Sequence, residues 1–415
     1  MPSAIGIDFG TTNSVVAMVA ADGSVRALRH PTGEVFRSIL CFWAGADGRP
    51  HKAAGSAAID AYLEEPLDSR LIMSMKSYLA QRSFTETRIF GRAWTLEGLI
   101  ALFLKELLAP FAGELAGARV TVGRPVRFVG ERADNDFGEQ RLRTAFAEAG
   151  LADVEVGLEP AAAGHRFAQE LDHPATVLVA DFGGGTSDFS LLRFDPGPPR
   201  RVTALGHSGV GIAGDAFDFR IIDHVVSPLL GKGTQYTVMG GSPLPVPPAW
   251  YSAFARWNQL SMMRAPRTLR DIATVARTAE HPERLHHLIA LIEQEAGYAL
   301  YRAVSGVKAA LSKQDSAVLD FEHGDFELRT EIARRDFEAW IAPELARIAT
   351  AVDAALADAQ VGPDAVDRVF LTGGTSLVPA VRRIFEDRFG AERVLSGGEF
   401  VSVAEGLALM AREAA

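Results

Sequence analysis

The 415-residue chain has little cysteine and lysine, and it contains no long run of apolar or of basic residues. A single cysteine, Cys41, excludes an intramolecular disulfide framework and agrees with a reducing compartment. Lysine and arginine together number 42 against 52 acidic residues, and no segment concentrates the positive charge. Nucleic acid and anionic membranes are therefore not expected as partners.

Two further absences concern location. The most apolar region, residues 98–108, is interrupted by Lys105 and Glu106 and is too short to cross a bilayer. The first residues lead directly into a strand pattern, without the basic start and apolar core of a secretory signal. We expect a soluble, cytoplasmic, monomeric protein with about two or three domains.

The scarcity of lysine also excludes one class of nucleotide-binding enzyme. No lysine follows a glycine-rich loop in the Gly-Lys-Ser/Thr arrangement, so the chain is not a P-loop protein. The sequence Asp-Phe-Gly occurs at residues 8–10, 136–138 and 181–183, but no His-Arg-Asp sequence precedes any of them, which excludes a protein kinase. The six lysines are Lys52, Lys76, Lys105, Lys232, Lys308 and Lys313.

One short phrase is written twice. Residues 5–14 read IGIDFGTTNS and residues 179–188 read VADFGGGTSD, so an apolar strand runs into Asp-Phe-Gly and then into small residues and a threonine at both places. A parallel strand, helix, strand pattern follows the first copy, at residues 119–156. This duplication predicts two similar α/β lobes that share one site.

The duplicated aspartates are candidate metal ligands. Carboxylates that face each other at the ends of two strands, Asp8 and Asp181, can hold a hydrated Mg²⁺ ion. One such aspartate alone more often caps its own turn, but two copies followed by glycine and threonine favour the metal interpretation. Glu159 lies just before a helix, where it either orients a water molecule or simply interacts with the helix dipole.

Hydroxyl groups and glycine N–H groups in the turns suit phosphate oxygens. Such turns are often only turns, so the interpretation rests on their occurrence beside the aspartates. A further glycine pair after a strand, Gly373-Gly374, has the geometry in which backbone meets a nucleotide. The candidates from the two duplicated turns are Gly10, Thr11, Thr12, Gly184, Gly185 and Thr186.

Five segments in this order resemble the nucleotide-binding domain of the DnaK-type heat-shock chaperones, within the actin, sugar kinase and chaperone superfamily. They are the two phosphate motifs IGIDFGTTNS and VADFGGGTSD, the connecting helix from Glu159, the segment GVGIAGDAFDFRIID (209–223) and the adenosine motif LTGGTSLVP (371–379). The chaperones continue into a linker, a client-binding domain and a lid, whereas this sequence stops at Ala415. It therefore most resembles the short, linker-less YegD-like group.

The resemblance implies an actin-like ATPase fold of two lobes, each with a mixed sheet flanked by helices. Lobe I is expected at 1–175, lobe II at 176–400 with a helical subdomain at about 225–312, and a connecting helix at 401–415. The lobes are expected to close on ATP or ADP with Mg²⁺ about a hinge formed by the helices at Glu159 and Ser402.

The resemblance also assigns roles to residues. It implies that Asp8, Asp181 and Glu159 serve Mg²⁺ and its waters, with Asp8 and Asp181 as the metal ligands, mostly through water. Asp188 is implied to lie beside the attacking water and Thr186 to contact phosphate, and all five residues are expected to act in catalysis. The residues implied to contact the nucleotide are Gly10, Thr11, Thr12, Asn13, Gly183, Gly184, Gly185, Gly214, Asp215, Lys308, Ser312, Gly373, Gly374 and Thr375.

Several positions depart from the family pattern. Aligned on the preceding glycine, the catalytic lysine of the family corresponds to Ile59 here. Loss of an active-site cation costs orders of magnitude in phosphoryl transfer, about 10³ to 10⁵ for an arginine finger, so slow or absent turnover is expected. One hypothesis is that Lys76 replaces this cation, although a helical lysine is more often simply solvated. The adenine-enclosing arginines become Ala309 and Leu377, and an acidic residue becomes Phe400.

We expect a slow, Mg²⁺-dependent ATPase of the chaperone type, without the client-binding domain, whose lobe closure regulates a protein partner or co-chaperone. Two alternatives stay open. A small-molecule kinase of the sugar kinase type shares the fold, but its additional cleft aspartate is not recognisable. An actin-like filament-forming ATPase predicts ATP-dependent sedimentation, and nothing in the sequence marks a self-complementary surface.

Overall fold

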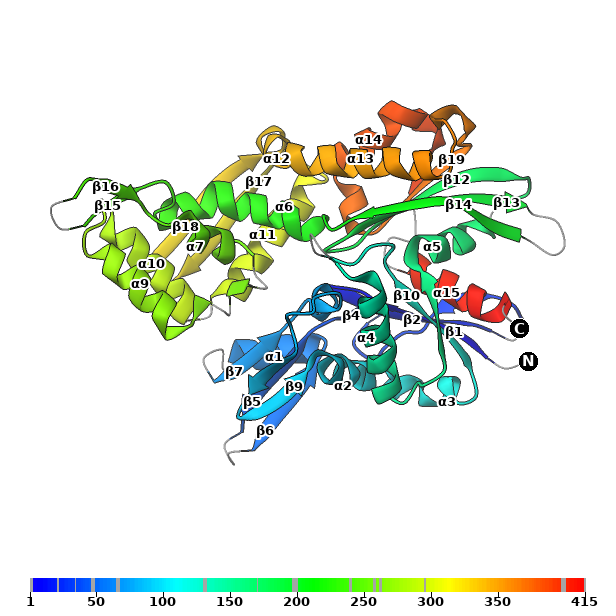
Figure 1. Ribbon diagram of the computed structural model, residues 1–415, viewed down its shortest axis with the longest axis horizontal. Coiled ribbons are helices and arrows are strands. Elements are labelled where there is room, and N and C mark those ends of the chain that lie inside the picture. Colours follow the sequence, from blue (N-terminus) through cyan, green and yellow to red (C-terminus); the bar gives the residue numbers. More distant parts are fainter. Residues whose placement is uncertain are drawn as a thin grey trace. The chain divides into compact units, whose positions relative to one another are not determined.

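The chain divides into two compact units in the computed structural model (Figure 1). Unit 1 comprises Met1–Gly214 and Leu345–Ala415, and unit 2 comprises Asp215–Glu344. The lobe boundaries predicted after residues 175 and 400 differ from this division and stay a prediction. The structure describes residues 3–20, 22–33, 35–45, 49–64, 68–129, 133–169, 171–195, 201–238, 241–256, 259–260, 263–294, 296–396 and 401–413.

The first large sheet of unit 1 is built around the strand that leads into the first glycine turn. Strand β1 pairs in parallel with β10 and antiparallel with β2, so the sheet is mixed. Alternate residues such as Ile5 and Ile7 are fully buried in the core. In sheet order the strands are β11 (Val154–Leu158), β10 (Arg119–Arg124), β1 (Ala4–Phe9), β2 (Asn13–Val19) and β3 (Val25–Ala27), with β4 (Phe36–Arg37) also paired to β2.

The second large sheet repeats this plan around the strand that leads into the second glycine turn. Strand β12 pairs in parallel with β19 and antiparallel with β13, as β1 does with β10 and β2. In sheet order the strands are β14 (Arg201–Val210), β13 (Ser187–Asp195), β12 (Ala175–Phe182), β19 (Arg368–Thr372) and β20 (Val394–Ser396). The duplicated phrase thus corresponds to a duplicated mixed sheet, and the predicted α/β class is confirmed.

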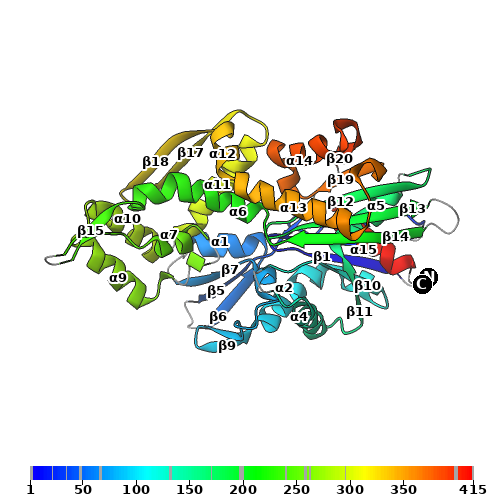
Figure 2. The same cartoon turned by 45° about the horizontal axis from the view of Figure 1, so that its top comes forward.

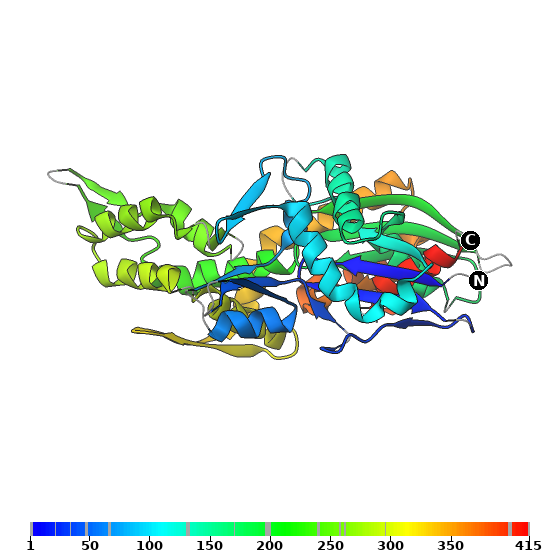
Figure 3. The same ribbon diagram turned by 90° about the horizontal axis from the view of Figure 1, so that it is seen from below.

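Helices cover both sheets of unit 1. Helices α2 (Leu96–Leu108) and α4 (Asn135–Glu148) pack on each other, and each has an N-cap, since Thr95 accepts from Gly98 N at 3.1 Å and Asp134 from Phe137 N at 3.0 Å. Helix α5 (Glu159–Ala168) packs along α15 (Ser402–Glu413), which also lies against β1 and β2, red beside blue in Figure 3. A methyl group on Gly406 of α15 would lie 1.7 Å from Ala162 O of α5, so the two helices cross at backbone contact.

Further elements complete unit 1, and one buried cluster of this unit includes the aromatic rings of Phe9, Phe36 and Phe103. A three-stranded sheet has the order β6, β5, β7, and β8 pairs with β9. These elements are β5 (Leu40–Ala44), β6 (Pro50–Ala54), α1 (Ser56–Glu64), β7 (Ser69–Ile72), η1 (Met75–Tyr78), β8 (Glu86–Ile89), β9 (Arg92–Thr95), η2 (Ala109–Phe111), α3 (Ala112–Leu115), α13 (Ala342–Asp358), η5 (Pro363–Ala365), η6 (Gly374–Leu377), α14 (Pro379–Phe389) and η7 (Ala391–Arg393).

Unit 2 is mainly helical and also contains a β-hairpin after its last long helix, and the helical subdomain predicted at about 225–312 stays a prediction. Strands β17 and β18 pair antiparallel beside α11 (Figure 2). The elements of unit 2 are α6 (Gly214–Ile221), η3 (Ile222–Val226), η4 (Ser227–Leu230), β15 (Gln235–Thr237), β16 (Pro243–Pro245), α7 (Pro248–Phe254), α9 (Pro266–Ala276), α10 (Pro282–Glu293), α11 (Gly297–Leu311), β17 (Ser316–His323), β18 (Phe326–Ala333) and α12 (Arg334–Trp340). In the described part of the chain, no helix has both the length and the apolar character to cross a membrane.

Candidate functional site

The first glycine turn connects β1 to β2 and is held by backbone and side-chain hydrogen bonds. A methyl group on Gly10 would lie 2.2 Å from Asn13 O, so only glycine fits where the turn folds back on itself. The carbonyl of Thr12 accepts from Ser38 N at 2.9 Å, and Asn13 Oδ1 accepts from Arg37 Nη1 at 2.9 Å. The turn is thus fixed in shape by its own backbone and by the segment around β4.

The second glycine turn connects β12 to β13. Gly183 N donates to Thr186 O at 2.9 Å, which closes the turn, and Gly184 and Gly185 lie at its tip. Thr186 is buried, and the adjacent Ser187 donates from its hydroxyl to Ile212 O at 2.6 Å. This second turn therefore has a fixed shape as well.

The third glycine turn follows β19 and packs against the second. Gly373 has a φ of +84°, which favours glycine, and a methyl group there would lie 2.0 Å from Phe182 O. Gly374 and Thr375 continue into η6, and Thr375 Oγ1 donates to Gly183 O at 3.4 Å. Two of the three predicted ligand-binding turns are therefore in direct contact.

Four carboxylates influence one another beside these turns. The pKa of Asp181 lies well above its ordinary value because the group is buried and because Glu159 and Asp8 disfavour its ionisation. Burial, followed by the charge of Glu159, raises the pKa of Asp8 to about 7. The four groups come from separate elements: Asp8 from β1, Glu159 from the first residue of α5, Asp181 from β12, and Asp188 from its cross-strand position on β13.

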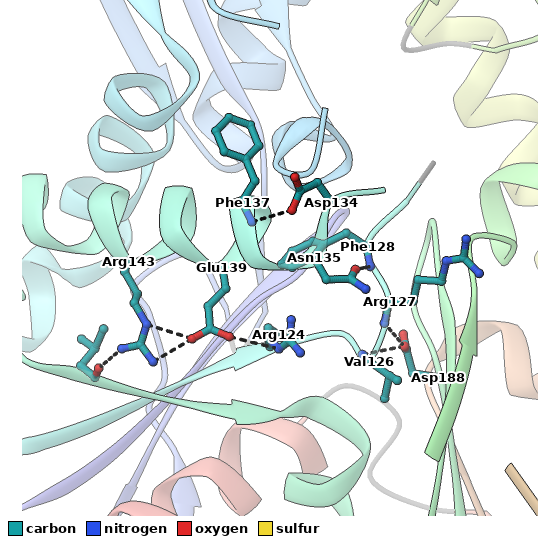
Figure 4. A network of polar contacts seen from close by, with 11 residues as sticks. Arg124, Val126, Arg127, Phe128, Asp134, Asn135, Phe137, Glu139, Arg143 and Asp188 are labelled. Atoms are coloured by element: carbon teal, nitrogen blue, oxygen red, sulfur yellow. Dashed lines mark hydrogen bonds and ion pairs between the residues drawn. The ribbon is translucent and has the colours of Figure 1, made fainter. Parts of the chain in front are cut away.

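Asp188 is oriented by the loop that follows β10 (Figure 4). Its Oδ1 accepts from Val126 N at 2.8 Å and from Arg127 N at 3.2 Å. The same loop is tied to α4, because Asn135 Oδ1 accepts from Phe128 N at 3.1 Å. Burial and then the charge of Glu159 raise the pKa of Asp188 to about 7, so this carboxyl group is partly protonated at neutral pH.

Lys76 supplies a cation to this cluster, and the expectation that the cation is lost is wrong. Lys76 Nζ donates to Glu159 Oε1, and the two side chains are each only 7% exposed. Burial alone would lower the pKa of Lys76, but the charges of Glu159 and Asp8 outweigh it and raise the pKa above 10.5. Ile59, the position aligned with the family's lysine, lies on α1. An alignment that counts residues from a preceding glycine cannot show which element brings its side chain to the carboxylates.

The short helix η1 that carries Lys76 follows an unusual backbone conformation and is anchored at its C-terminal end. The residue before it, Ser74, is 2% exposed and has the left-handed angles φ 49° and ψ 36°, an uncommon conformation for serine. After it, Arg141 Nη1 of α4 donates to the carbonyl oxygens of Tyr78 and Gln81, at 3.4 Å each. Arg141 is 4% exposed and donates from Nε and Nη2 to Glu97 at 2.5 and 3.2 Å.

The carboxylate cluster fits a hydrated divalent cation. Its carboxylates face the ammonium group of Lys76, and three of them have raised pKa values, first because they are buried and then because the charge of Glu159 disfavours their ionisation. Carboxylate oxygen is the donor that Mg²⁺ prefers, and Mg²⁺ keeps several water molecules. No group of three or more His, Cys, Asp or Glu in the described part of the chain is arranged to hold an ion directly.

The predicted adenosine-contacting residues Lys308 and Ser312 have hydrogen-bond partners within unit 2. On α11, Lys308 Nζ donates to Asp218 Oδ2 at 2.8 Å, and Ser312 Oγ donates to Lys308 O at 3.2 Å. Gly214 is the first residue of α6, and Asp215 follows it. The nucleotide contacts assigned to these residues stay predictions.

Two residues stand where the family has arginines that enclose the adenine. Ala309 is exposed on α11, and Leu377 is 44% exposed at the end of η6. Phe400 lies outside the described residues. The expectation that adenine is enclosed without arginines here stays a prediction.

Sequence reasoning weighed Lys76 only as a hypothesis and missed Arg141 and Asp218. The available signal for Lys76 was a scarce residue type inside the apolar stretch LIMSMKSYLA. Arg141 has no local signal, because its partner Glu97 is 44 residues away. Asp218 lies in the segment 209–223, and its buried partnership with Lys308 spans 90 residues.

Comparison with known proteins agrees with this architecture. The family model described as "Hsp70 protein" matches residues 133–234 and 285–412. The chain is 27% identical over 413 residues to "Chaperone protein DnaK" of Thermotoga petrophila, and 26% identical over 419 residues to that of Thermosipho africanus. These matches cover 98% of this chain but only 59% and 58% of the relatives. The two mixed sheets have the expected actin-like ATPase fold, and the chain belongs to the Hsp70 family.

Proposed function

We propose that unit 1 binds ATP together with Mg²⁺ and hydrolyses the ATP. The observation that carries this proposal is the buried pair of Lys76 and Glu159, set among the carboxylates at the ends of two strands that each lead into a glycine turn. Buried charges with strongly shifted pKa values are typical of functional sites. Membership of the Hsp70 family supports the choice of ATP.

The glycine turns would bind the phosphate groups. The hydroxyls of Thr11 and Thr186 and the N–H groups of the Gly183–Gly185 turn donate hydrogen bonds to phosphate oxygens. Both threonines are largely buried, each 9% exposed as a residue, so few orientations are open to their side chains before a ligand arrives. Gly373 and Gly374, in contact with the second turn through Thr375, approach the adenosine.

Asp8 and Asp181 would hold the waters of Mg²⁺, which when bound neutralises charge on the phosphate oxygens. Asp188 accepts a hydrogen bond from the attacking water, and with a pKa of about 7 it can take up the proton that the water loses. Lys76 stabilises the charge that develops on the transferred phosphoryl group, a contribution that reaches about 10³ to 10⁵ in rate for an arginine finger. With Lys76 present, the reason for expecting very slow turnover falls away.

We propose further that closure of the two sheets about α5 and α15 changes the affinity of the chain for a protein partner. Support comes from the backbone contact between Gly406 and Ala162, a close crossing without bulky side chains of the kind a hinge needs. The relatives are named as chaperones, so a partner of chaperone type is the one we propose.

Isothermal titration of the chain with ATP and Mg²⁺ tests the binding proposal. We expect saturable heat with wild type and none with Gly184→Asp, which introduces bulk and negative charge into the second glycine turn. The absence of heat from wild type at millimolar ATP would refute the proposal. Phosphate transferred to a metabolite faster than to water would favour a kinase, and ATP-dependent sedimentation would favour a filament.

A further inference from the structure

Ser77, the residue after Lys76, faces the second glycine turn. A methyl group placed on Gly185 would lie 3.5 Å from Ser77 Oγ and 3.7 Å from Thr11 Oγ1. Hydroxyls from η1 and from the first glycine turn thus converge beside the side-chain-free Gly185 of the second turn. Ser77 is 6% exposed, so its hydroxyl is held inside unit 1 and does not point into open solvent.

The backbone of η1 explains why two neighbouring side chains of this helix serve two parts of the site. With three residues per turn, adjacent side chains on a 3₁₀ helix diverge by about 120°. Lys76 is directed to Glu159, and Ser77 is directed to Gly185. Ser77 N donates to Ser74 O at 3.0 Å and Ser77 O accepts from Gln81 Nε2 at 3.0 Å, which fixes the backbone that presents the hydroxyl.

We propose that the Ser77 hydroxyl donates a hydrogen bond to the γ-phosphate of ATP and so makes the site prefer ATP over ADP. The inference rests on the proposed ATP site in unit 1. The γ-phosphate is the part of the ligand that the Lys76 and Glu159 pair must reach, and Ser77 is covalently next to Lys76. Thr11, whose hydroxyl lies near the same point beside Gly185, contacts the same phosphate group or the one before it.

The test compares the dissociation constants of the β,γ-imido analogue of ATP and of ADP, both with Mg²⁺, in wild type and in Ser77→Ala. A hydrogen bond to a charged group is worth enough that its loss should raise the constant of the analogue by about 10-fold to 100-fold. The constant of ADP should change by less than about twofold, because ADP has no γ-phosphate to lose a contact with. Ser77→Thr, which keeps the hydroxyl, should retain the preference of wild type, and Ser83→Ala, at an exposed position, should change neither constant.

Equal weakening of both ligands in Ser77→Ala, or no change in either, would overturn the inference while leaving the ATP site intact. Loss of the preference in Ser77→Thr would also overturn it, which keeps the inference testable if Ser77→Ala does not fold. If wild type binds neither ligand, the proposed function itself fails. Binding constants are the readout throughout, so the result does not depend on hydrolysis.

Discussion

Replacing Arg141 with methionine should destabilise unit 1 and displace the segment that carries Lys76. The guanidinium group of Arg141 joins Glu97 of α2 to the carbonyl oxygens of Tyr78 and Gln81, which follow Lys76 in the chain. Methionine keeps much of the length and the apolar stem of the side chain but makes none of these bonds. Both stability and hydrolysis are therefore expected to fall.

The structure sets the size of the stability loss. Removing one partner of a buried ion pair costs about 3 to 5 kcal/mol. Glu97 keeps an 18% exposed side chain, so water partly compensates the carboxylate, and the two bonds to carbonyl oxygens are long at 3.4 Å. We expect the lower end of the range, about 3 kcal/mol in the free energy of unfolding.

The loss should depend on pH in a defined direction. Burial alone would raise the pKa of Glu97, but hydrogen bonding and charge from Arg141 outweigh burial and lower the pKa below 4.5. A carboxyl group with a lowered pKa in the folded state stabilises the fold above its ordinary pKa and loses this effect as the pH falls. The difference between wild type and Arg141→Met should therefore be full at pH 7 and shrink below pH 4.5.

Urea unfolding of wild type, Arg141→Met, Glu97→Gln and the double variant measures these quantities. The losses in the free energy of unfolding of Arg141→Met and Glu97→Gln should not add in the double variant, because both substitutions break the same ion pair. Arg88→Met, at an exposed position of β8, serves as the control and should stay within about 0.5 kcal/mol of wild type. A loss below about 1 kcal/mol in Arg141→Met, or full additivity in the double variant, would refute the anchoring role.

Two other predictions concern packing and protonation. Gly406→Ala would place a methyl group 1.7 Å from Ala162 O, so urea unfolding should show a loss of about 1 to 3 kcal/mol or more, and wild-type stability would contradict the crossing. Because the folded pKa of Asp188 is raised to about 7, its carboxyl group favours the folded state at low pH and this stabilisation is lost as the pH rises from about 4 to 7. A shift of one pKa unit corresponds to about 1.4 kcal/mol. Between pH 5 and pH 8 the free energy of unfolding of wild type should therefore fall by roughly 2 to 3 kcal/mol more than that of Asp188→Asn. Equal falls in the two proteins would contradict the raised pKa of Asp188.

The sequence was sufficient to predict the duplicated sheets, because local features determine them. An apolar alternation ending in Asp-Phe-Gly marks β1 and β12, and the same residues carry Asp8 and Asp181 to the ends of those strands. The turns could be predicted for the same reason, since Gly10 and Gly373 occupy positions that only glycine tolerates.

Long-range pairing could not be predicted in the same way. Lys76 and Glu159 are 83 residues apart, and neither local periodicity nor spacing shows that their side chains meet. Alignment on a nearby glycine wrongly gives Ile59 as the position of the catalytic lysine. The path of the backbone between that glycine and the carboxylates cannot be read from the sequence. The left-handed backbone of Ser74, which leads into η1, has no sequence signal, because serine rarely adopts it.

Single-turnover hydrolysis of ATP by Lys76→Met measures whether this lysine is the catalytic cation of the site. The matched control is Lys105→Met, which removes an exposed lysine of α2. We expect the rate to fall by about 10³-fold or more in Lys76→Met, while the control hydrolyses ATP as wild type does. An unchanged rate in a folded Lys76→Met that still binds ATP would contradict a catalytic role for Lys76.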